Sequence, residues 1–532
     1  MIATVGALVR LARAGHRLAR EGVFSGLNTD EMPPGAALGV RFARLFERRS
    51  SDTDDIPRAQ RMARALERLG PTYIKLGQFL ATRPDLVGAD VSAGLESLRD
   101  RLPPFPQDEA VAVLEEELGR PLDQLFERFD PPIAAASVAQ VHRARLPGAS
   151  EDVAVKILRP GIEAKLDRDI RAFARAAWLV EALMPSSRRL KPQATVATLG
   201  KSLAQECDLR MEASATSEIA ENMARDETSD AGFRVPEVDW SRTARRCMAT
   251  TWIDGIPLGQ VEAIRAAGHD MEALGQTVIR SFLRMAMRDG VFHADMHQGN
   301  LFVDAAGRLV AVDFGIVGRL GEPEQRYLAE ILSGFLRRDY LHVARMHFEA
   351  GYVPETQDVA TFAQALRAIG EPLQDRRADE IAMGRVLTQL FETTATFGME
   401  TQTQLILLQK TMVVTEGVAR SLDPKLDMWR TAEPVVAEWV ARRVGPAAIV
   451  REATTTLQSA LKTMAELPDL IARIEGAAAR LAASHGTGGI RLDTETTDKL
   501  AKGLAREVLY MRIAVIVGGI GLLALAAYEV FG

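Results

Sequence analysis

The sequence predicts an α+β fold built in two lobes, and the distribution of residue patterns along the chain supports this class. Short runs rich in β-branched residues crowd the segment 131–158, and another such run ends in a turn at 248–257. Beyond residue 258 the apolar residues recur mostly at helical spacing. Strands gathered in one part of a chain and helices in another are typical of α+β folds. We therefore expect a small lobe at 131–257 and a large helical lobe at 258–430.

Composition narrows the class of protein further. The chain has 532 residues, of which 47% are hydrophobic, enough to bury a large core in more than one unit. Its formal net charge of -6 argues against a nucleic-acid partner, which would favour a basic face. The two cysteines, Cys207 and Cys247, are too few for a disulfide framework, and the eight histidines show no zinc spacing. A reducing, cytosol-facing compartment is therefore expected.

The segment 293–315, HADMHQGNLFVDAAGRLVAVDFG, carries the residues of a phosphoryl-transfer site at the required spacing. Asp295 and Asn300 fit the pattern H-x-D-x-x-x-x-N, in which the Asp positions or deprotonates an attacking hydroxyl and the Asn holds magnesium. After a turn and an apolar strand, Asp313 in the string DFG supplies a second metal ligand. Because two motifs occur in order across one hairpin, the segment is interpreted as the catalytic half of a kinase-like site.

A lysine on a buried strand is the third requirement of such a site. The run VAVKIL at 153–158 contains Lys156, whose burial is costly unless its ammonium meets anions. Lys156 is therefore expected to hold phosphates. Upstream, where most kinases carry a glycine-rich loop, the chain has AAASVAQ, whose methyl groups keep backbone amides farther from phosphate oxygens. The expected nucleotide-binding residues of this loop are Ala134, Ala135, Ala136, Ser137 and Val138.

These motifs together resemble the UbiB-like atypical kinases, a family of bacterial UbiB proteins and mitochondrial coenzyme Q kinase-like proteins. The resemblance rests on the alanine-rich loop, on Lys156, on the HADMHQGN and VDFG segments, and above all on KLGQ at 75–78. That string is similar to the family's K-x-G-Q signature, and the likeness extends from about Arg58 to about Ala350. It implies a two-lobed protein-kinase-like fold with an N-terminal helical K-x-G-Q extension at 56–130.

Two separate ion pairs are expected beside this site. Glu206 and Glu212 are six residues apart, so on one helix they point roughly 120° away from each other, and one lysine cannot satisfy both. Glu212 resembles the family's helix partner of the strand lysine, which implies a pair with Lys156. Glu206 and Asp208 resemble the family's E-x-D motif, and Lys75 is implied to reach Glu206. The resemblance thus makes Asp295, Lys156 and Glu212 catalytic residues and Lys75, Gln78, Glu206 and Asp208 regulatory residues.

The segment 248–257, MATTWIDGIP, resembles the family's hinge between the lobes, whose backbone binds adenine. It has the pattern of a strand that ends in a turn. The resemblance implies that Trp252 and Ile253 contact the base, and that ATP or ADP with Mg²⁺ is the cofactor. Asn300 and Asp313 would hold the metal.

The two ends of the chain predict contact with a membrane. The segment 1–55 begins with arginines at helical intervals, typical of an amphipathic surface helix or an organelle transit peptide, and the Ala- and Arg-rich usage favours the surface helix. After a helical region and linker at 431–507, the segment 508–531 is the most apolar of the chain and predicts a C-terminal transmembrane helix, if Arg512 snorkels. Basic residues before it place the kinase-like domain in the cytoplasm. A buried core helix is the alternative for 508–531.

The resulting hypothesis is a membrane-attached atypical kinase-like ATPase that supports ubiquinone or other isoprenoid-quinone biosynthesis, tail-anchored in the bacterial inner membrane. The pathway follows from the resemblance alone, which implies as partners adenine nucleotide, membrane lipid or isoprenoid quinone precursors, and other quinone-biosynthesis proteins, but no nucleic acid. Two alternatives stay open: a small-molecule phosphotransferase of the aminoglycoside or choline kinase type, and a non-enzymatic nucleotide-sensing scaffold. The KLGQ string and the alanine-rich loop favour the ATPase over the phosphotransferase, and the intact charged residues favour an enzyme over a scaffold.

Overall fold

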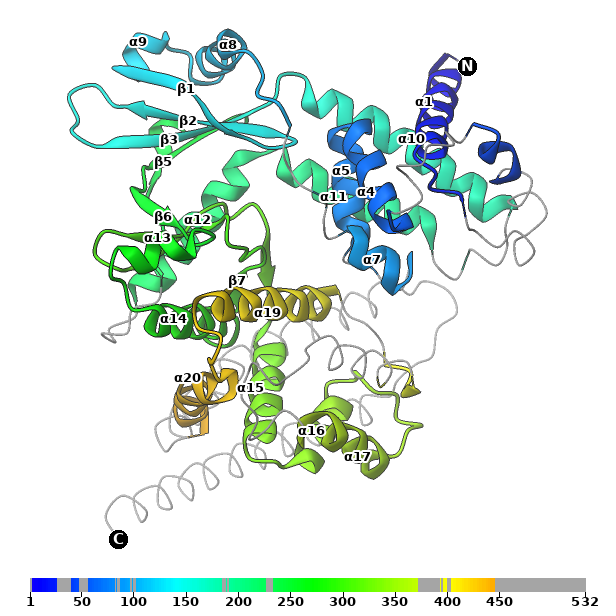
Figure 1. The fold of residues 1–532 in the computed structure, drawn as a ribbon, viewed down its shortest axis with the longest axis vertical. Helices are drawn as coiled ribbons and strands as arrows, with labels where there is room; N and C mark the ends of the chain where they lie inside the picture. Colours follow the sequence, from blue (N-terminus) through cyan, green and yellow to red (C-terminus); the bar gives the residue numbers. More distant parts are fainter. Residues whose placement is uncertain are drawn as a thin grey trace, which may run out of the picture. The chain divides into compact units, whose positions relative to one another are not determined.

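The computed structural model describes residues 2–25, 40–46, 56–81, 102–183, 191–225, 233–371 and 403–444, together with 83, 87–95, 98, 188, 393 and 396–399. Contacts divide the chain into two units, Met1–Val435 and Val436–Gly532. The fold described below is that of the first unit (Figure 1). The last described helix, α20 (Met428–Val444), contains Pro434 and crosses the boundary between the units.

A five-stranded antiparallel sheet of order β1-β2-β3-β5-β4 forms the small lobe. Side chains alternate across a strand, so Val153, Val155 and Ile157 of the third strand are buried on one face. Lys156 therefore points to the opposite face. The strands are β1 (Arg128–Ala135), β2 (Ala139–Arg145), β3 (Asp152–Leu158), β4 (Val238–Asp239) and β5 (Cys247–Thr251), and a 3₁₀ turn, η2 (Trp240–Arg242), joins the last two.

Helices α8 (Gln107–Leu118) and α9 (Leu122–Leu125) cover the apolar face of this sheet (Figure 1). Val113, Leu114 and Leu125 belong to the same buried cluster as the inward residues of β3. Helices α8 and α9, which lie within the predicted extension at 56–130, thus share a buried core with the small-lobe sheet.

The N-terminal extension is a cluster of helices around the K-x-G-Q string. Its helix α5 approaches its neighbours closely because Gly77 has no side chain: a Cβ there would lie 2.2 Å from Cδ1 of Leu98 and 2.8 Å from Cδ1 of Leu66. The glycine of the string thus has a packing role. The helices that share this core are α1 (Ile2–Arg20), α4 (Arg58–Leu69), α5 (Pro71–Ala81), α7 (Ala89–Leu95), α10 (Ile162–Leu183) and α11 (Pro192–Glu206).

The first helix, α1, has one face in this core. Ala7 and Ala14 are buried, and Arg10 lies 3.9 Å from Asp169 of α10. The helix predicted from the arginine spacing is present. Its buried face contacts protein, so the structure does not support attachment of that face to a membrane.

The large lobe is mostly helical, as predicted. Its helices are α13 (Val261–Ala266), α14 (Met271–Arg284), the π-helical turn η3 (Met285–Asp289), α15 (Glu322–Leu336), α16 (Tyr340–Glu349), α17 (Val359–Gly370) and α19 (Thr403–Leu422). Its strands are β6 (Gly255–Pro257), β7 (Val291–His293), β8 (Leu301–Asp304), β9 (Leu309–Ala311) and β10 (Val317–Arg319). Strands β6, β8 and β9 form one small sheet, and β7 and β10 form another. The β8–β9 hairpin separates Asn300 from Asp313 in sequence and returns the chain to the same end of the sheet.

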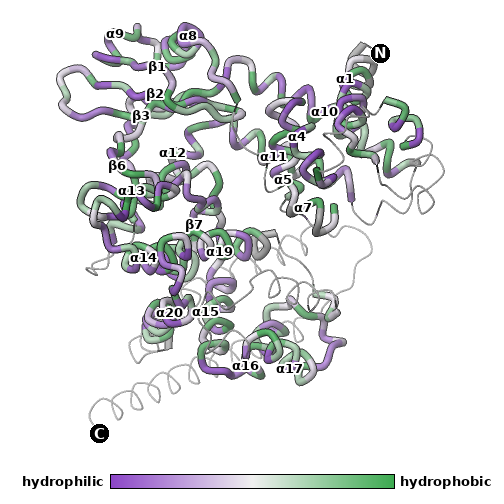
Figure 2. Tube along the Cα trace, viewed as in Figure 1, coloured by the Kyte–Doolittle hydropathy of each residue, from purple (hydrophilic) through white to green (hydrophobic). Residues whose placement is uncertain are grey.

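None of the described helices combines the length and the hydropathy that a bilayer crossing requires. Hydrophobic and hydrophilic residues are interspersed along these helices, as in helices with one buried face (Figure 2). The predicted transmembrane segment 508–531 and most of the helical region and linker at 431–507 lie outside the described residues.

Gly77→Ala should destabilise the protein, because the added methyl group overlaps two leucine side chains in a filled core. Overpacking of this kind costs about 1–3 kcal/mol and lowers the melting temperature. Gly15→Ala in α1 is the matched control, since no neighbouring atom lies within 4 Å of a Cβ there and alanine favours a helix. If thermal unfolding of the full-length variants shows wild-type melting temperatures for both, the packing role of Gly77 is refuted.

Candidate active site

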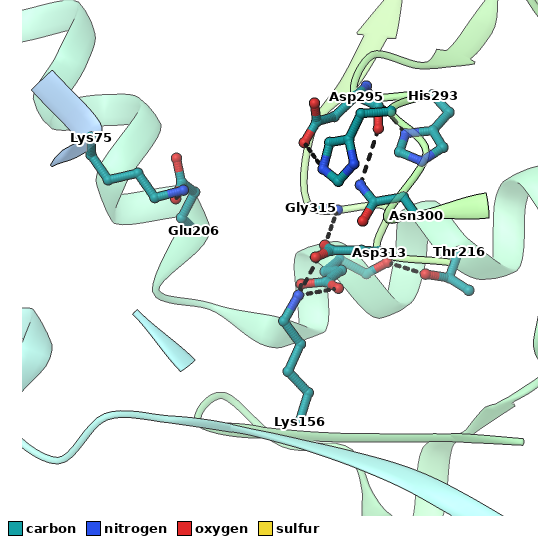
Figure 3. A network of polar contacts seen from close by, with 11 residues as sticks. Lys75, Lys156, Glu206, Thr216, His293, Asp295, Asn300, Asp313 and Gly315 are labelled. Atoms are coloured by element: carbon teal, nitrogen blue, oxygen red, sulfur yellow. Dashed lines mark hydrogen bonds and ion pairs between the residues drawn. The ribbon is translucent and has the colours of Figure 1, made fainter. Parts of the chain in front are cut away.

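The Lys156 ammonium is the centre of a charged cluster that joins the small-lobe sheet to the large lobe (Figure 3). Its Nζ donates to Glu212 Oε1 at 2.7 Å, to Glu212 Oε2 at 2.9 Å, and to Asp313 Oδ1 at 3.0 Å. The side chains of Lys156 and Glu212 are only 19% and 10% exposed. Glu212 lies in the first turn of α12 (Leu209–Ala224), where the helix dipole also favours a carboxylate. The ion pair predicted between Lys156 and Glu212 is present.

Lys75 and Glu206 form the second predicted ion pair, with 2.7 Å between Nζ and Oε2, and both side chains are largely buried. The single helix assumed to carry Glu206 and Glu212 is wrong. Helix α11 ends at Glu206, Cys207 caps it, and α12 begins at Leu209. The two acids diverge because the chain breaks between them.

Asp208 occupies that break as the N-cap of α12. Its Oδ1 accepts from the Arg210 N–H at 3.2 Å, and its two oxygens accept from the Arg210 guanidinium at 2.8 and 2.6 Å. These bonds give Asp208 a structural task next to Glu206. Gln78 is half-buried on α5, three residues after Lys75.

Asp313 stands just after β9 in a backbone conformation that residues other than glycine rarely adopt, with a φ of 62°. Strained positions of this kind persist where the surroundings fix them. Lys156 binds Oδ1 of Asp313, and the Gly315 N–H lies 3.4 Å from the same oxygen. A Cβ on Gly315 would lie 3.2 Å from that oxygen, so glycine leaves room for it. These contacts hold the carboxylate beside the lysine.

The charges of the cluster shift the pKa values of its three members. Burial opposes a charged Lys156, but the Asp313 and Glu212 carboxylates outweigh it and hold the pKa of Lys156 above its usual range. Burial likewise opposes an ionised Asp313, but the Lys156 charge prevails and holds its pKa below the usual range. Burial raises the pKa of Glu212 to about 7, against the pull of Lys156 and with the help of the Asp313 charge. Of the two carboxylates, Glu212 therefore takes up a proton first as the pH falls.

The catalytic loop, residues 294–300, follows β7 and is bonded to the side chain of His293. This ring is buried, its Nδ1 accepts the Asp295 N–H at 3.3 Å, and its centroid lies 4.8 Å from that of Phe314. Burial lowers the pKa of His293, so the ring is neutral near pH 7. His293 thus ties the loop that carries Asp295 to the segment that carries Asp313.

Asn300 presents an oxygen toward Asp313. Its Nδ2 donates to the Asp295 carbonyl at 3.0 Å, so its Oδ1 faces the other way, on the side of Asp313 (Figure 3). Magnesium takes oxygen ligands and commonly combines one or two protein groups with phosphate oxygens and waters. The Asn300 amide oxygen and the Asp313 carboxylate fit such an ion. Within the described part of the chain, no group of three or more His, Cys, Asp and Glu side chains gathers as a metal site.

The alanine-rich loop turns between β1 and β2 and is held by Arg159. The Arg159 guanidinium donates to the Ala136 carbonyl at 3.1 and 2.8 Å, and the Arg159 N–H donates to the Val138 carbonyl at 2.8 Å. Arg159 was not among the predicted site residues, although its place directly after the lysine strand was a signal. Of the expected nucleotide-binding residues, β1 contains Ala134 and Ala135, and the turn contains Ala136, Ser137 and Val138.

Trp252 and Ile253 follow β5, where the chain leaves the small-lobe sheet. The Trp252 N–H donates to the carbonyl of Asp152, the first residue of β3, at 3.0 Å. The indole Nε1 donates to Asp254 Oδ1 at 2.7 Å, and the Arg143 guanidinium lies 4.7 Å from the ring centroid. The Trp252 N–H is therefore already bonded within the sheet.

Helix α19 contacts the catalytic loop at three points, none of which the sequence analysis anticipated. Thr411 and Thr415 are buried four residues apart on one face of the helix, and two threonines at this spacing in an apolar helix were the available signal. The contacts lie on both sides of Asp295, and one of them reaches a backbone carbonyl. Thr411 Oγ1 shares its hydrogen between the Leu407 carbonyl at 2.8 Å and the Ala294 carbonyl at 3.1 Å. Thr415 Oγ1 donates to the Thr411 carbonyl at 2.7 Å and lies 3.8 Å from Met296 Sδ, and Gln298 Nε2 donates to Ser421 Oγ at 2.9 Å.

The site and the fold define a class of protein. A strand lysine bound by a helix glutamate, a loop aspartate with an asparagine five residues on, and a second aspartate after a hairpin are the parts of a protein-kinase-like fold. The α+β kinase-like fold predicted from the sequence is confirmed.

Comparisons with known proteins place the chain more narrowly. Residues 97–347 match the ABC1 atypical kinase-like domain, and residues 366–427 match the UbiB helical domain. The chain is 40% identical over 421 residues to the probable protein kinase UbiB of Marinobacter nauticus. This alignment covers 78% of this chain and 76% of that protein. The solved complex of Rv3197 with erythromycin from Mycobacterium tuberculosis aligns at 22% identity with a TM-score of 0.47, over 70% of this chain and 93% of that one. On the family matches, the chain belongs to the ABC1/UbiB atypical kinase family, as its motifs indicated.

Thr411→Val should destabilise the protein more than Thr415→Val, although both residues are buried on the same face of α19. Valine keeps the shape but removes the hydroxyl, so in both variants the carbonyl four residues earlier loses a donor. Only Thr411→Val also removes the donor shared with the Ala294 carbonyl, and a buried acceptor without its partner costs about 1–3 kcal/mol. The second neighbour of the Thr415 hydroxyl is a thioether sulfur, which is a weak acceptor. Thermal unfolding of both variants measures the difference. Equal melting temperatures would contradict the assigned contact.

Proposed function

We propose that this protein binds ATP with Mg²⁺ and hydrolyses it, or transfers its γ-phosphoryl group, at the Lys156 site. The double contact of Lys156 with Glu212 and Asp313 carries the proposal. A lysine fixed in this way offers its charge to phosphate oxygens, and phosphoryl transfer depends chiefly on positioning and charge stabilisation. Asn300 and Asp313 hold the metal. When bound, Mg²⁺ would neutralise the charge that develops on the phosphate oxygens.

Each of the remaining residues takes a task that its own contacts support. Asp295 lies in the catalytic loop with its side chain 42% exposed, and it orients or deprotonates the attacking hydroxyl or water. Glu212 keeps the Lys156 ammonium in place. The Ile253 backbone borders the adenine, and the alanine-rich loop, fixed by Arg159, borders the phosphates.

The K-x-G-Q extension restricts which acceptors reach the site in this proposal. Lys75 is bound to Glu206 at 2.7 Å. Burial opposes an ionised Asp313, and the charge of Lys75 adds to that of Lys156 in lowering the pKa of this carboxyl. In this proposal the extension that carries Lys75 takes up space that a peptide acceptor needs. Hydrolysis, or transfer to a small acceptor, is therefore favoured over phosphorylation of proteins in trans.

The setting we propose is ubiquinone or other isoprenoid-quinone biosynthesis at the bacterial inner membrane. Family membership and the name UbiB of the Marinobacter nauticus relative support it, and they favour it over a phosphotransferase of the aminoglycoside or choline kinase type. The apolar segment 508–531, with basic residues before it, supports membrane attachment with the kinase-like domain on the cytoplasmic side. Membrane lipid, quinone precursors or other quinone-biosynthesis proteins are the partners consistent with this setting.

Asp313→Asn should remove the magnesium-dependent part of nucleotide binding, because a neutral amide replaces an ionised carboxylate ligand. In calorimetric titrations, Mg²⁺ should raise the ATP affinity of the wild type and leave that of the variant unchanged. Asp270→Asn makes the same chemical change at the N-cap of α14, where asparagine also caps well, and should behave as wild type. Equal ATP affinities in wild type and Asp313→Asn, with and without Mg²⁺, would sink the assignment.

The biological setting is tested by complementation. Deletion of the gene should lower the isoprenoid-quinone content of the cell, wild type should restore it, and Asp313→Asn should not. A chain truncated after Thr497 should leave the membrane fraction. A normal quinone content in the deletion strain would contradict the pathway, and a wholly soluble full-length protein would contradict the membrane attachment.

A further inference from the structure

His297 lies two residues after Asp295 in the catalytic loop and has no part in the site as described so far. Its Nδ1 accepts the Gly299 N–H at 2.9 Å, and its Nε2 lies 3.6 Å from Asp295 Oδ2. The two side chains are 52% and 42% exposed, so both face the open side of the loop.

The bond from Gly299 determines which nitrogen of His297 carries hydrogen. A neutral imidazole has one donor and one acceptor nitrogen. Since Nδ1 accepts the Gly299 N–H, Nε2 is the N–H, and this N–H faces Asp295 Oδ2. A separation of 3.6 Å exceeds a formed hydrogen bond. Catalytic hydrogen bonds without substrate are often long and tighten when substrate binds.

Gly299 also leaves the space in which the His297 ring lies. A Cβ on Gly299 would lie 2.8 Å from Cε1 and 3.0 Å from Nδ1 of His297, closer than side-chain atoms approach each other. The turn is closed on both sides, since the His297 N–H donates to the Asp295 carbonyl at 2.9 Å and the Asn300 N–H donates to the His297 carbonyl at 3.0 Å. The loop therefore holds the imidazole between the Gly299 N–H and the Asp295 carboxylate.

We propose that His297 is a positioning residue for phosphoryl transfer: its Nε2–H binds Oδ2 of Asp295 and leaves Oδ1 to the attacking hydroxyl or water. The inference rests on the proposed function, in which Asp295 orients or deprotonates that nucleophile. A carboxylate held at one oxygen presents the other in a defined direction, and misplacement of a reacting group by about 1 Å costs up to about 100-fold in rate. His293 differs, since it is buried and holds the backbone of Asp295 rather than its carboxylate.

The test compares substitutions at His297 in the full-length protein, with Mg²⁺-dependent phosphate release from ATP as the assay. His297→Leu removes the donor and should lower kcat about 10- to 100-fold with little change in the KM for ATP. His297→Gln keeps an N–H near the position of Nε2 and should recover most of that loss. If the His297 ring only filled space, glutamine would restore kcat no better than leucine does. An equal loss of kcat in both variants, or no loss in His297→Leu, would therefore overturn the proposal.

Two further variants separate this inference from the function on which it rests. Gly299→Ala keeps His297 but displaces its ring, and it should lower kcat as His297→Leu does, so it serves if His297→Leu does not fold. Its backbone does not require a positive φ, and alanine is compatible with it. Wild-type kcat in Gly299→Ala would overturn the proposal. Asp295→Asn tests the function itself: if it hydrolyses ATP as wild type does, the catalytic role of Asp295 fails, whereas an inactive Asp295→Asn with a fully active His297→Leu refutes only the role of His297.

Discussion

The ammonium of Lys156 is the group on which the geometry of this site depends, because it binds carboxylates from two other parts of the chain. Glu212 comes from the start of α12 and Asp313 from the end of the β8–β9 hairpin, yet both lie within 3.0 Å of Nζ. A lysine that is mostly removed from water is costly unless it is paired. The pairing satisfies this lysine, connects the small lobe to the large lobe, and holds Asp313 in a backbone conformation that it would otherwise avoid.

The two glutamates near this cluster each pair with a different lysine. The break between α11 and α12 sends Glu206 toward Lys75 and Glu212 toward Lys156. Asp208 stabilises that break by capping α12. The K-x-G-Q extension is thus bonded, through Lys75 and Glu206, to the end of α11. The next helix, α12, supplies Glu212, the partner of Lys156, so the extension contacts the segment that leads into the site.

The catalytic loop is fixed from several sides, with contacts of different kinds. The buried His293 ring accepts the Asp295 N–H, and Asn300 donates to the Asp295 carbonyl. Helix α19 contacts the loop through buried threonines. The α19 contacts come from the segment that matches the UbiB helical domain. A helix of that domain therefore packs directly against the loop that carries Asp295.

The sequence by itself determined those features that depend on spacing within one element. Alternation in the 153–158 run placed Lys156 opposite the buried valines, and the intervals in 293–315 placed Asp295, Asn300 and Asp313 in one site. Tertiary structure decided what depends on contacts between distant segments. The helix assumed through Glu206 and Glu212 breaks because Asp208 caps a new helix, and α8 joins the small lobe because its apolar face meets β3. Tertiary packing also decided two hydrogen-bond contacts between distant segments. They are the bond from the Trp252 N–H to the Asp152 carbonyl and the contact of Thr411 with the Ala294 carbonyl. No periodicity within a segment records which distant carbonyl a donor will meet, because that partner is set by how the elements pack.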